Sequence, residues 1–398
     1  MKGKHTFFII AFLCYHFLAS QTNEERFVQS MAYGDSKSAL EYFNHIENKE
    51  SLKSDIHYYA SIAYAKANDL NNALEQLNIA TDKGLANIEI FNDGTLDTLK
   101  TISEYAKIES KLVSNKEMAM QELSKLHDKL IYKYNSDPSS SKVELEMTPA
   151  KHQGNRNTCS AFAATSIAEY ILKDELGDTI DLSESYNYYI SKKKALSNSF
   201  LKKAYEPVDG LAGYLALEGY KYGTAQETKW NYEQNNWLNT NDEKCKKNQG
   251  VPNVECFTGM PPDGFKPMSK TFKTIFIPFK DIGDFLLSEK KPVLVNIWLY
   301  RNGIDMETGE LRIPPKDNEQ LMGGHVIVIT GYDSEKQEYT FKNSWGSSWG
   351  TNGFGTMPKA YLENHYEASK SLPFNLDASI EEKEYLAKVS LGSSLILE

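Results

Sequence analysis

The stretch TPAKHQGNRNTCSAFAATSIAEY, residues 148–170, places Cys159 at the start of a run whose small and apolar residues recur at helical spacing. Far downstream, GGHVIVITGYD (323–333) supplies His325 and YTFKNSWGSSWGTNGFG (339–355) supplies Asn343. A cysteine, a histidine and an asparagine in this order can act as a nucleophile, its base and the group that orients the base. Gln153 lies close enough to Cys159 in a tight turn to donate its amide to the oxygen of an attacked carbonyl.

The surroundings of these residues suit the same chemistry. A helix that begins near Cys159 would offer unpaired backbone N–H groups, which favour a thiolate. His325 opens an apolar run, and Gly324 before it leaves the ring approachable by substrate. Asn343 can accept from the second ring nitrogen, with Trp345 as a lid that excludes water. Taken singly, a buried inert cysteine, a satisfied core histidine and an asparagine in a turn are the alternatives.

After residue 141 the sequence combines helical stretches with later strand-like runs. Helical spacing covers residues 159–172 and 213–222. The strand-like runs are TIFIPF (274–279), PVLVNIWLY (292–300), HVIVITGY (325–332) and EYTFKNSW (338–345). Helices first and strands later predict a helical layer beside a mostly antiparallel sheet, an α+β domain over residues 142–398.

Residues 21–134 form a separate helical region with an internal repeat. DSKSALEYFNHI (35–46) and DLNNALEQLNIA (69–80) match at five positions, each pair 34 residues apart. This period is typical of tetratricopeptide helix hairpins, so we expect an all-α, tetratricopeptide-like domain. About three stacked hairpins are needed for stability, which predicts a degenerate third hairpin over residues 88–112. NSDPSSS (135–141) interrupts the helical pattern and is the predicted linker.

Taken together, the segments after residue 142 resemble the papain-like cysteine peptidases, in their more divergent bacterial form. Beyond the motifs already quoted, the resemblance includes LSES (182–185) and DGLAGYLALEGYKYGTAQETKWNY (209–232), where the family has a glycine-bearing substrate strand. It implies a two-lobed fold and cofactor-free peptide hydrolysis, with Gln153, Cys159, His325 and Asn343 catalytic and Gly210, Gly324 and Trp345 at the substrate. Ser160 and Arg156 depart from the family pattern, and Arg156 replaces a cysteine that would form a family disulfide.

The N-terminus and the charge bear on location and partners. Residues 1–20 carry two lysines, an apolar stretch and then small residues, which predicts a signal peptide cleaved near Ser20 and a secreted or periplasmic protein. A lipid-modified Cys14 is the less favoured alternative, because Leu13 before it is large. The formal net charge of −10 argues against nucleic acid and anionic membranes as partners. No membrane span is expected after signal removal.

Three cysteines remain after signal removal. Cys245 and Cys256 lie in a polar Gly/Pro loop, and export favours a disulfide between them over a metal site. Cys159 is then the unpaired thiol. No phosphate loop, dinucleotide motif or metal-ligand cluster occurs, so neither cofactor nor metal is expected. The aromatic run SYNYYIS (185–191) is interpreted as core and strand residues, and the lysines at 192–194 as a solvated face.

The main hypothesis is an exported thiol endopeptidase whose helical repeats recruit a peptide substrate or a protein partner. The helical region could instead keep the enzyme latent until cleavage at 135–141, or only assist folding. The rival from another class is a catalytically silent adaptor that binds a protein partner through the repeats. An exopeptidase or a transferase would use the same acyl-enzyme.

Overall fold

The computed structural model describes residues 22–32, 34–86, 94–177, 179–198, 201–202, 205, 208–234, 254–315, 320–365 and 391–397. The predicted signal peptide therefore lies outside the described residues. Contacts divide the chain into two compact units, which part between His127 and Asp128. The predicted linker at 135–141 lies after this division. No helix in the described ranges has the length and apolar character needed to span a membrane.

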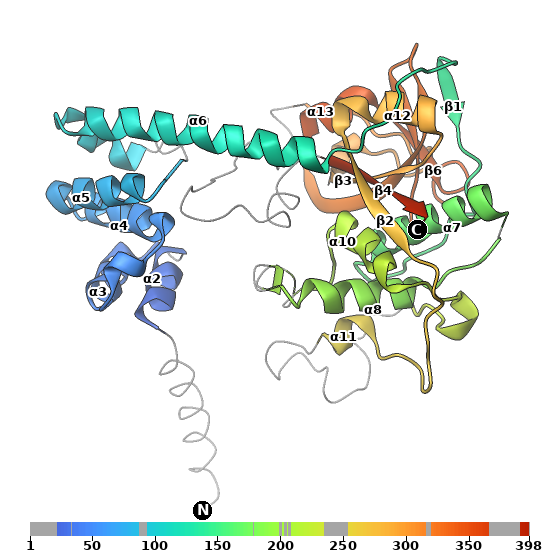
Figure 1. Ribbon diagram of the computed structural model, residues 1–398, viewed down its shortest axis with the longest axis horizontal. Coiled ribbons are helices and arrows are strands. Elements are labelled where there is room, and N and C mark those ends of the chain that lie inside the picture. Colours follow the sequence, from blue (N-terminus) through green and yellow to red (C-terminus); the bar gives the residue numbers. More distant parts are fainter. Residues whose placement is uncertain are drawn as a thin grey trace, which may run out of the picture. The chain divides into compact units, whose positions relative to one another are not determined.

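The elements described in the first unit are all helices (Figure 1). Its elements are α2 (Asn23–Ala32), α3 (Ser36–Asn44), α4 (Ser54–Lys66), α5 (Leu70–Asp82), η3 (Gly94–Thr101) and α6 (Tyr105–Leu130). The 34-residue repeat has a structural counterpart: Asp35 and Asp69 each cap a helix by accepting from the backbone N–H three residues on, and Ala39 and Ala73 are both fully buried. Assignment to the tetratricopeptide class stays a prediction.

The third hairpin predicted over residues 88–112 falls partly outside the described residues, which resume at Gly94. There η3 is followed by α6, which continues to Leu130. Leu96, Leu99 and Leu112 from these elements join Leu77 of α5 in one apolar cluster, so the segment after the repeats closes the core of this unit.

The second unit is built on one antiparallel sheet in the order β2-β7-β3-β4-β5-β6, with β1 paired to β4 (Figure 1). The strands are β1 (Lys142–Glu144), β2 (Phe272–Pro278), β3 (Val293–Tyr300), β4 (Leu321–Asp333), β5 (Glu338–Lys342), β6 (Phe354–Pro358) and β7 (Leu391–Leu397). The predicted α+β architecture and its four strand-like runs are confirmed. The central place of β7, between β2 and β3, was not predicted.

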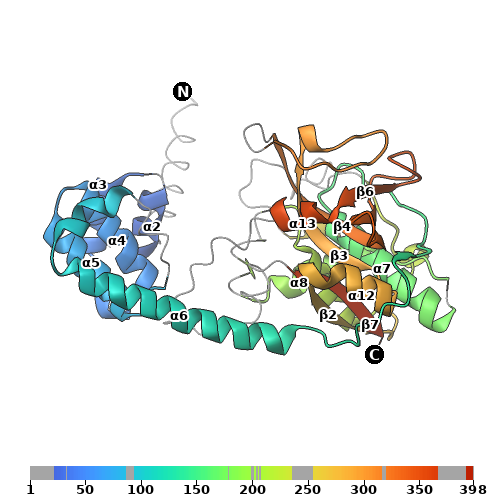
Figure 2. The ribbon, with the colours of Figure 1, turned by 90° about the horizontal axis from the view of Figure 1, so that it is seen from above.

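Helices α7 (Cys159–Leu176), α8 (Glu184–Ala195) and α10 (Gly213–Glu218) form the helical layer, and α11 (Glu255–Thr258), α12 (Ile282–Glu289) and α13 (Lys359–His365) complete the unit. In Figure 2, α7 and α12 lie against the sheet. Every residue of α7 from Ser160 to Leu172 is buried, so this helix is the centre of the core.

Two interpretations of the sequence around α8 are only partly right. Residues 185–191 do contribute to the core, but they form a helix buried on several faces and not a strand. Lys193 and Lys194 are exposed as expected, whereas Lys192 is 0% exposed. Its ammonium is satisfied inside the protein by two carbonyl oxygens, those of Val208 and Gly210.

The chain leaving α6 packs onto the sheet unit before the predicted linker. The backbone N–H of Tyr132 donates to Phe276 O in β2 at 2.9 Å. The rings of Tyr132 and Tyr134 meet the Phe285 ring edge-on, at centroid distances of 6.2 and 5.4 Å. Phe285 of α12 is fully buried and anchors this segment.

We therefore predict that Phe285→Ala lowers the free energy of unfolding of the second unit by about 3–5 kcal/mol, because the cavity and the lost ring contacts add. All five tryptophans lie at or after residue 230, so tryptophan fluorescence during urea unfolding reports on this unit. Met306→Ala, at a side chain 54% exposed, is the control and should change stability little. Equal midpoints for the two variants would contradict the prediction.

Candidate active site

Cys159 is the first residue of α7 and packs against the core of the second unit. The preceding Thr158 has no side-chain cap bond, and its hydroxyl instead lies 2.6 Å from Tyr232 Oη. Burial raises the pKa of the Cys159 thiol to about 11, while backbone hydrogen bonds from Val326, Ser160 and Cys159 itself act in the opposite direction. The bond with Val326 places the thiol beside the residue that follows His325.

His325 lies in β4 opposite Ile297 of β3 and is buried. Its Nε2 is 2.8 Å from Asn343 Oδ1, which also accepts from the N–H of Ser344 at 2.7 Å. The hydrogen bond from Ser344 N–H identifies the Asn343 atom that faces the ring as the amide oxygen, which can only accept. Nε2 of His325 therefore carries the proton, and Nδ1 has the free lone pair. Burial lowers the pKa of His325 to about 4, and the bond to Asn343 partly offsets this shift.

The indole of Trp345 covers the imidazole, with ring centroids 4.9 Å apart and planes tilted by 31°. Trp349 meets Trp345 edge-on at 5.4 Å and supports it from behind. The structure thus places an apolar ring where the sequence predicted a lid over the base. Such a cover keeps water from competing for the His325–Asn343 bond.

Gln153 is joined to the segment that carries Asn343. Its backbone N–H donates to Ser344 O at 2.9 Å, and its Oε1 accepts from Ser344 Oγ at 2.6 Å. Gly346 N–H donates to Lys151 O, so residues 151–153 and 344–346 pair as short antiparallel segments. The Gln153 amide gives one N–H to Arg156 O at 2.8 Å and keeps a second for another acceptor.

Arg156, at the position of the absent family cysteine, is 1% exposed. Its guanidinium donates to Glu233 O and Phe257 O, both at 2.8 Å, and lies 4.8 Å from the centre of the Tyr232 ring. Glu233 and Phe257 come before and after residues 235–253 in the sequence, so one cation joins two described segments that are distant in the sequence. Cys256 is buried in α11, whereas Cys245 lies outside the described residues and the disulfide stays a prediction.

The two predicted substrate-binding glycines differ in their surroundings. Gly324 pairs with Trp298 of β3, and a side chain built on it would meet only that indole, at 3.7 Å. Gly210 has a φ of +130°, and its N–H and C=O both take part in internal hydrogen bonds. Their roles toward substrate stay predictions.

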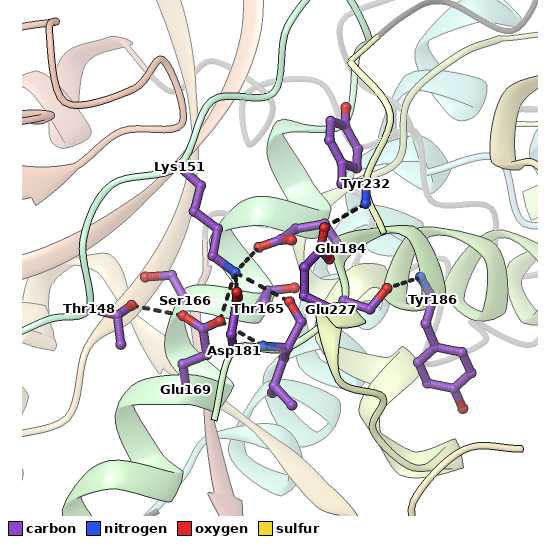
Figure 3. A network of polar contacts seen from close by, with 12 residues as sticks. Thr148, Lys151, Thr165, Ser166, Glu169, Asp181, Glu184, Tyr186, Glu227 and Tyr232 are labelled. Carbon is purple, nitrogen blue, oxygen red and sulfur yellow. Dashed lines mark hydrogen bonds and ion pairs between the residues drawn. The ribbon is translucent and has the colours of Figure 1, made fainter. Parts of the chain in front are cut away.

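Two buried carboxylates and the exposed Asp181 surround the ammonium of Lys151 in a charge cluster (Figure 3). The Lys151 ammonium contacts Glu169 and Glu184 at 2.9 Å and Asp181 at 2.5 Å. Burial opposes this charge, but Glu184 and Glu169 together raise the pKa of Lys151. Lys342, next to Asn343, donates to Ser166 Oγ of α7 at 2.7 Å, and burial lowers its pKa to about 8. The cluster links the active-site loop, α7 and β5.

Within this cluster, Glu184 is the carboxyl whose charge is least supported. Glu169 also accepts from Thr148 Oγ1 at 2.8 Å and from Leu182 N–H at 2.9 Å. Glu184 is 2% exposed, and burial raises its pKa to about 8 despite the opposing effect of Lys151. A protonated Glu184 leaves the single Lys151 ammonium to two carboxylates instead of three.

Sequence reasoning did not find this cluster, nor the role of Ser344 between Gln153 and Asn343. Lys151 and Lys342 both stand inside the quoted motifs. One sequence carries no sign that Lys151 contacts carboxylates on α7 and α8, or that Lys342 reaches a hydroxyl of α7. Among the described residues, no group of three or more His, Cys, Asp or Glu side chains could hold a metal ion.

Residues 135–373 match the model of the papain family of cysteine proteases, and the chain belongs to that family. It is similar to cysteine proteinase 3 of Dictyostelium discoideum, with 27% identity over 219 residues that cover 54% of this chain and 56% of that protein. Human cathepsin L2 is 25% identical over 222 residues, which cover 54% of this chain and 58% of the cathepsin. The chain thus spans little more than half the length of these relatives.

Among solved structures, xylellain, a cysteine protease from Xylella fastidiosa, aligns with 21% identity and a TM-score of 0.46 over 59% of this chain and 87% of that one.

The raised pKa of Glu184 predicts how stability depends on pH. Between about pH 4.5 and 8 the folded protein keeps a proton that the unfolded chain has lost, so the stabilising contribution of Glu184 falls as pH rises through this window. Glu184→Gln, which cannot ionise, should not show this loss. The difference in melting temperature, variant minus wild type, should therefore increase by about 5 °C or more between pH 5 and pH 8.5.

Thermal unfolding followed by circular dichroism checks this prediction. Glu146→Gln is the matched control, because the Glu146 side chain is 92% exposed and its ion pair with Lys173 is a surface one. A difference between Glu184→Gln and wild type that stays constant with pH would show that Glu184 is ionised throughout.

Proposed function

We propose that this chain is an exported cysteine peptidase that hydrolyses peptide bonds through a thioester acyl-enzyme on Cys159. The observation that carries the proposal is the His325 Nε2–Asn343 Oδ1 bond under the Trp345 ring, in a member of the papain family whose Cys159 begins a buried helix. The fixed tautomer leaves Nδ1 as the only basic ring nitrogen. That is the requirement for a base beside a nucleophilic thiol.

In the first half-reaction the proton of the Cys159 thiol has already passed to His325 Nδ1, and the Cys159 thiolate attacks the carbonyl carbon. The negative charge moves to the carbonyl oxygen, where the second N–H of Gln153 and the backbone N–H of Cys159 can donate to it. When the C–N bond breaks, the imidazolium gives its proton to the departing amine. A thioester remains on Cys159.

In the second half-reaction water attacks the thioester carbonyl, and His325 Nδ1 takes a proton from this water. The C–S bond then breaks, the proton returns to the sulfur, and the carboxylic acid leaves. Throughout both steps Asn343 accepts from Nε2–H, which keeps the ring oriented and stabilises its positive charge. Because neither the thiolate nor the imidazolium is stable alone in this buried site, the two charges form together.

The remaining features belong to the same proposal. Residues 1–20 serve as a signal peptide for export, and residues 21–134 form a tetratricopeptide-like domain that recruits a substrate or partner. The repeat of capped hairpins, with Asp35 and Asp69 in equivalent places, supports this assignment. A Cys245–Cys256 disulfide would stabilise the predicted loop between the two segments that Arg156 joins. An endopeptidase is favoured, with Gly210, Gly324 and Trp345 lining the substrate.

We predict that Cys159→Ala reduces hydrolysis of an end-blocked fluorogenic peptide by at least about a thousandfold, because the variant lacks the nucleophile. Its melting temperature should stay close to that of wild type, since the substituted side chain lies at the end of α7. In wild type, an epoxysuccinyl inhibitor should add one adduct to the intact mass, and peptide mapping should place it on Cys159.

Residual turnover by Cys159→Ala would contradict the mechanism, and an unlabelled wild type would favour the adaptor hypothesis. Labelling that appears only after removal of the residues before Asp128 would show that the helical unit enforces latency. Cleavage of peptides with a free end, but not of blocked ones, would indicate an exopeptidase.

A further inference from the structure

Lys192 of α8 is a fully buried cation that the proposed reaction does not use. Its ammonium donates to Val208 O and, at 3.2 Å, to Gly210 O. It also lies 4.7 Å from the centre of the Phe257 ring and 5.7 Å from that of Tyr188. A buried ammonium destabilises the fold unless its N–H groups have acceptors. The carbonyls of Val208 and Gly210 therefore hold Lys192 in place, and Lys192 in turn holds these carbonyls in place.

One turn earlier on α8, the fully buried Tyr188 holds the same segment from another side. Its hydroxyl donates to Asp209 Oδ1 at 2.6 Å and accepts from Gly210 N–H at 2.8 Å. The second carboxylate oxygen of Asp209 accepts from Asn157 N–H at 3.0 Å. Asn157 is two residues before Cys159, so this chain of hydrogen bonds connects α8, the segment 208–210 and the loop that carries the nucleophile.

The segment also packs closely on that loop. A Cβ on Gly210, whose φ of +130° suits glycine, would lie 3.5 Å from Asn157 O. The next residue, Leu211, is 7% exposed, and neither its N–H nor its C=O has a hydrogen-bond partner among the described residues. Without a partner among the described residues, these two backbone groups can hydrogen-bond to a peptide main chain.

We propose that Tyr188, Asp209 and Lys192 are positioning residues that hold the segment 208–211 beside Cys159, so that its main chain binds the substrate peptide. These three residues hold the segment through hydrogen bonds and the buried cation of Lys192. The family cysteine is replaced by Arg156 in the same site. The inference rests on the proposed function, because it assigns these residues to binding of that substrate. They touch neither the nucleophile nor its base and act through the backbone they hold.

The test compares Tyr188→Phe with Tyr189→Phe. The first variant removes only the hydroxyl that joins Gly210 and Asp209. The second removes the hydroxyl of the neighbouring tyrosine, which accepts from Lys193 at 3.1 Å on the outer side of α8. Two reagents report on Cys159: iodoacetamide needs only the thiol and its base, whereas a peptidyl epoxysuccinate also needs the substrate-binding segment.

For Tyr188→Phe we expect the ratio of the epoxysuccinate inactivation rate to the iodoacetamide inactivation rate to fall about tenfold. A tenfold change is the size expected when one well-formed hydrogen-bonding group is lost. KM for a peptide should rise more than kcat falls. Tyr189→Phe should match wild type. An unchanged ratio, or equal losses with both reagents, would overturn the proposal.

Amide hydrogen exchange gives a readout that does not depend on catalysis. The Gly210 N–H should exchange faster in Tyr188→Phe and in Lys192→Met than in wild type, and unchanged exchange in both variants would also overturn the proposal. If the Gly210 N–H of wild type is protected from exchange but Cys159 reacts with neither reagent, the proposed function is contradicted and the positioning role is not.

Discussion

The low-polarity surroundings of the partly buried Cys159 thiol and the buried His325 imidazole are the constraint on which the rest of the site depends. Burial disfavours a thiolate and an imidazolium when either stands alone, raising one pKa to about 11 and lowering the other to about 4. The proposed reaction therefore requires the two charges to form together. The Asn343 carbonyl, fixed by the Ser344 N–H, supports the imidazolium without adding a net charge to the site.

The geometry of this site depends on the residues around it. The paired segments 151–153 and 344–346 place Gln153 and Asn343 on one hydrogen-bonded unit. Behind them, the Lys151 cluster joins the active-site loop to α7 and α8, while Lys342 reaches α7 from β5. Each of these connections is polar and at least partly buried, so removing one partner leaves another with a hydrogen-bonding group to satisfy. At position 156 the buried guanidinium of Arg156 contributes further hydrogen bonds, to Glu233 O and Phe257 O.

The sequence predicted the parts of this arrangement that local patterns encode. Helical spacing after Cys159 and apolar runs over four strands were sufficient for the α+β architecture, and the order of Cys159, His325 and Asn343 indicated the chemistry. Local patterns failed where long-range contacts decide. The run at 185–191 has the aromatic content of a strand but forms the buried helix α8. Lys192 is buried because backbone carbonyls of a later segment, including that of Val208, accept hydrogen bonds from its ammonium. Nothing near residue 391 indicates that β7 enters the sheet between β2 and β3.

The most direct measurement of coupled charging is the pH dependence of Cys159 alkylation by iodoacetamide in wild type and His325→Ala. With the imidazole present, we expect a thiolate already at pH 6–7 and a rate that changes little up to pH 9. Without it, the thiolate must form alone, so the rate should be low at pH 6 and rise about tenfold per pH unit toward the raised pKa of about 11. Superimposable profiles for the two proteins would contradict the pairing of Cys159 with His325.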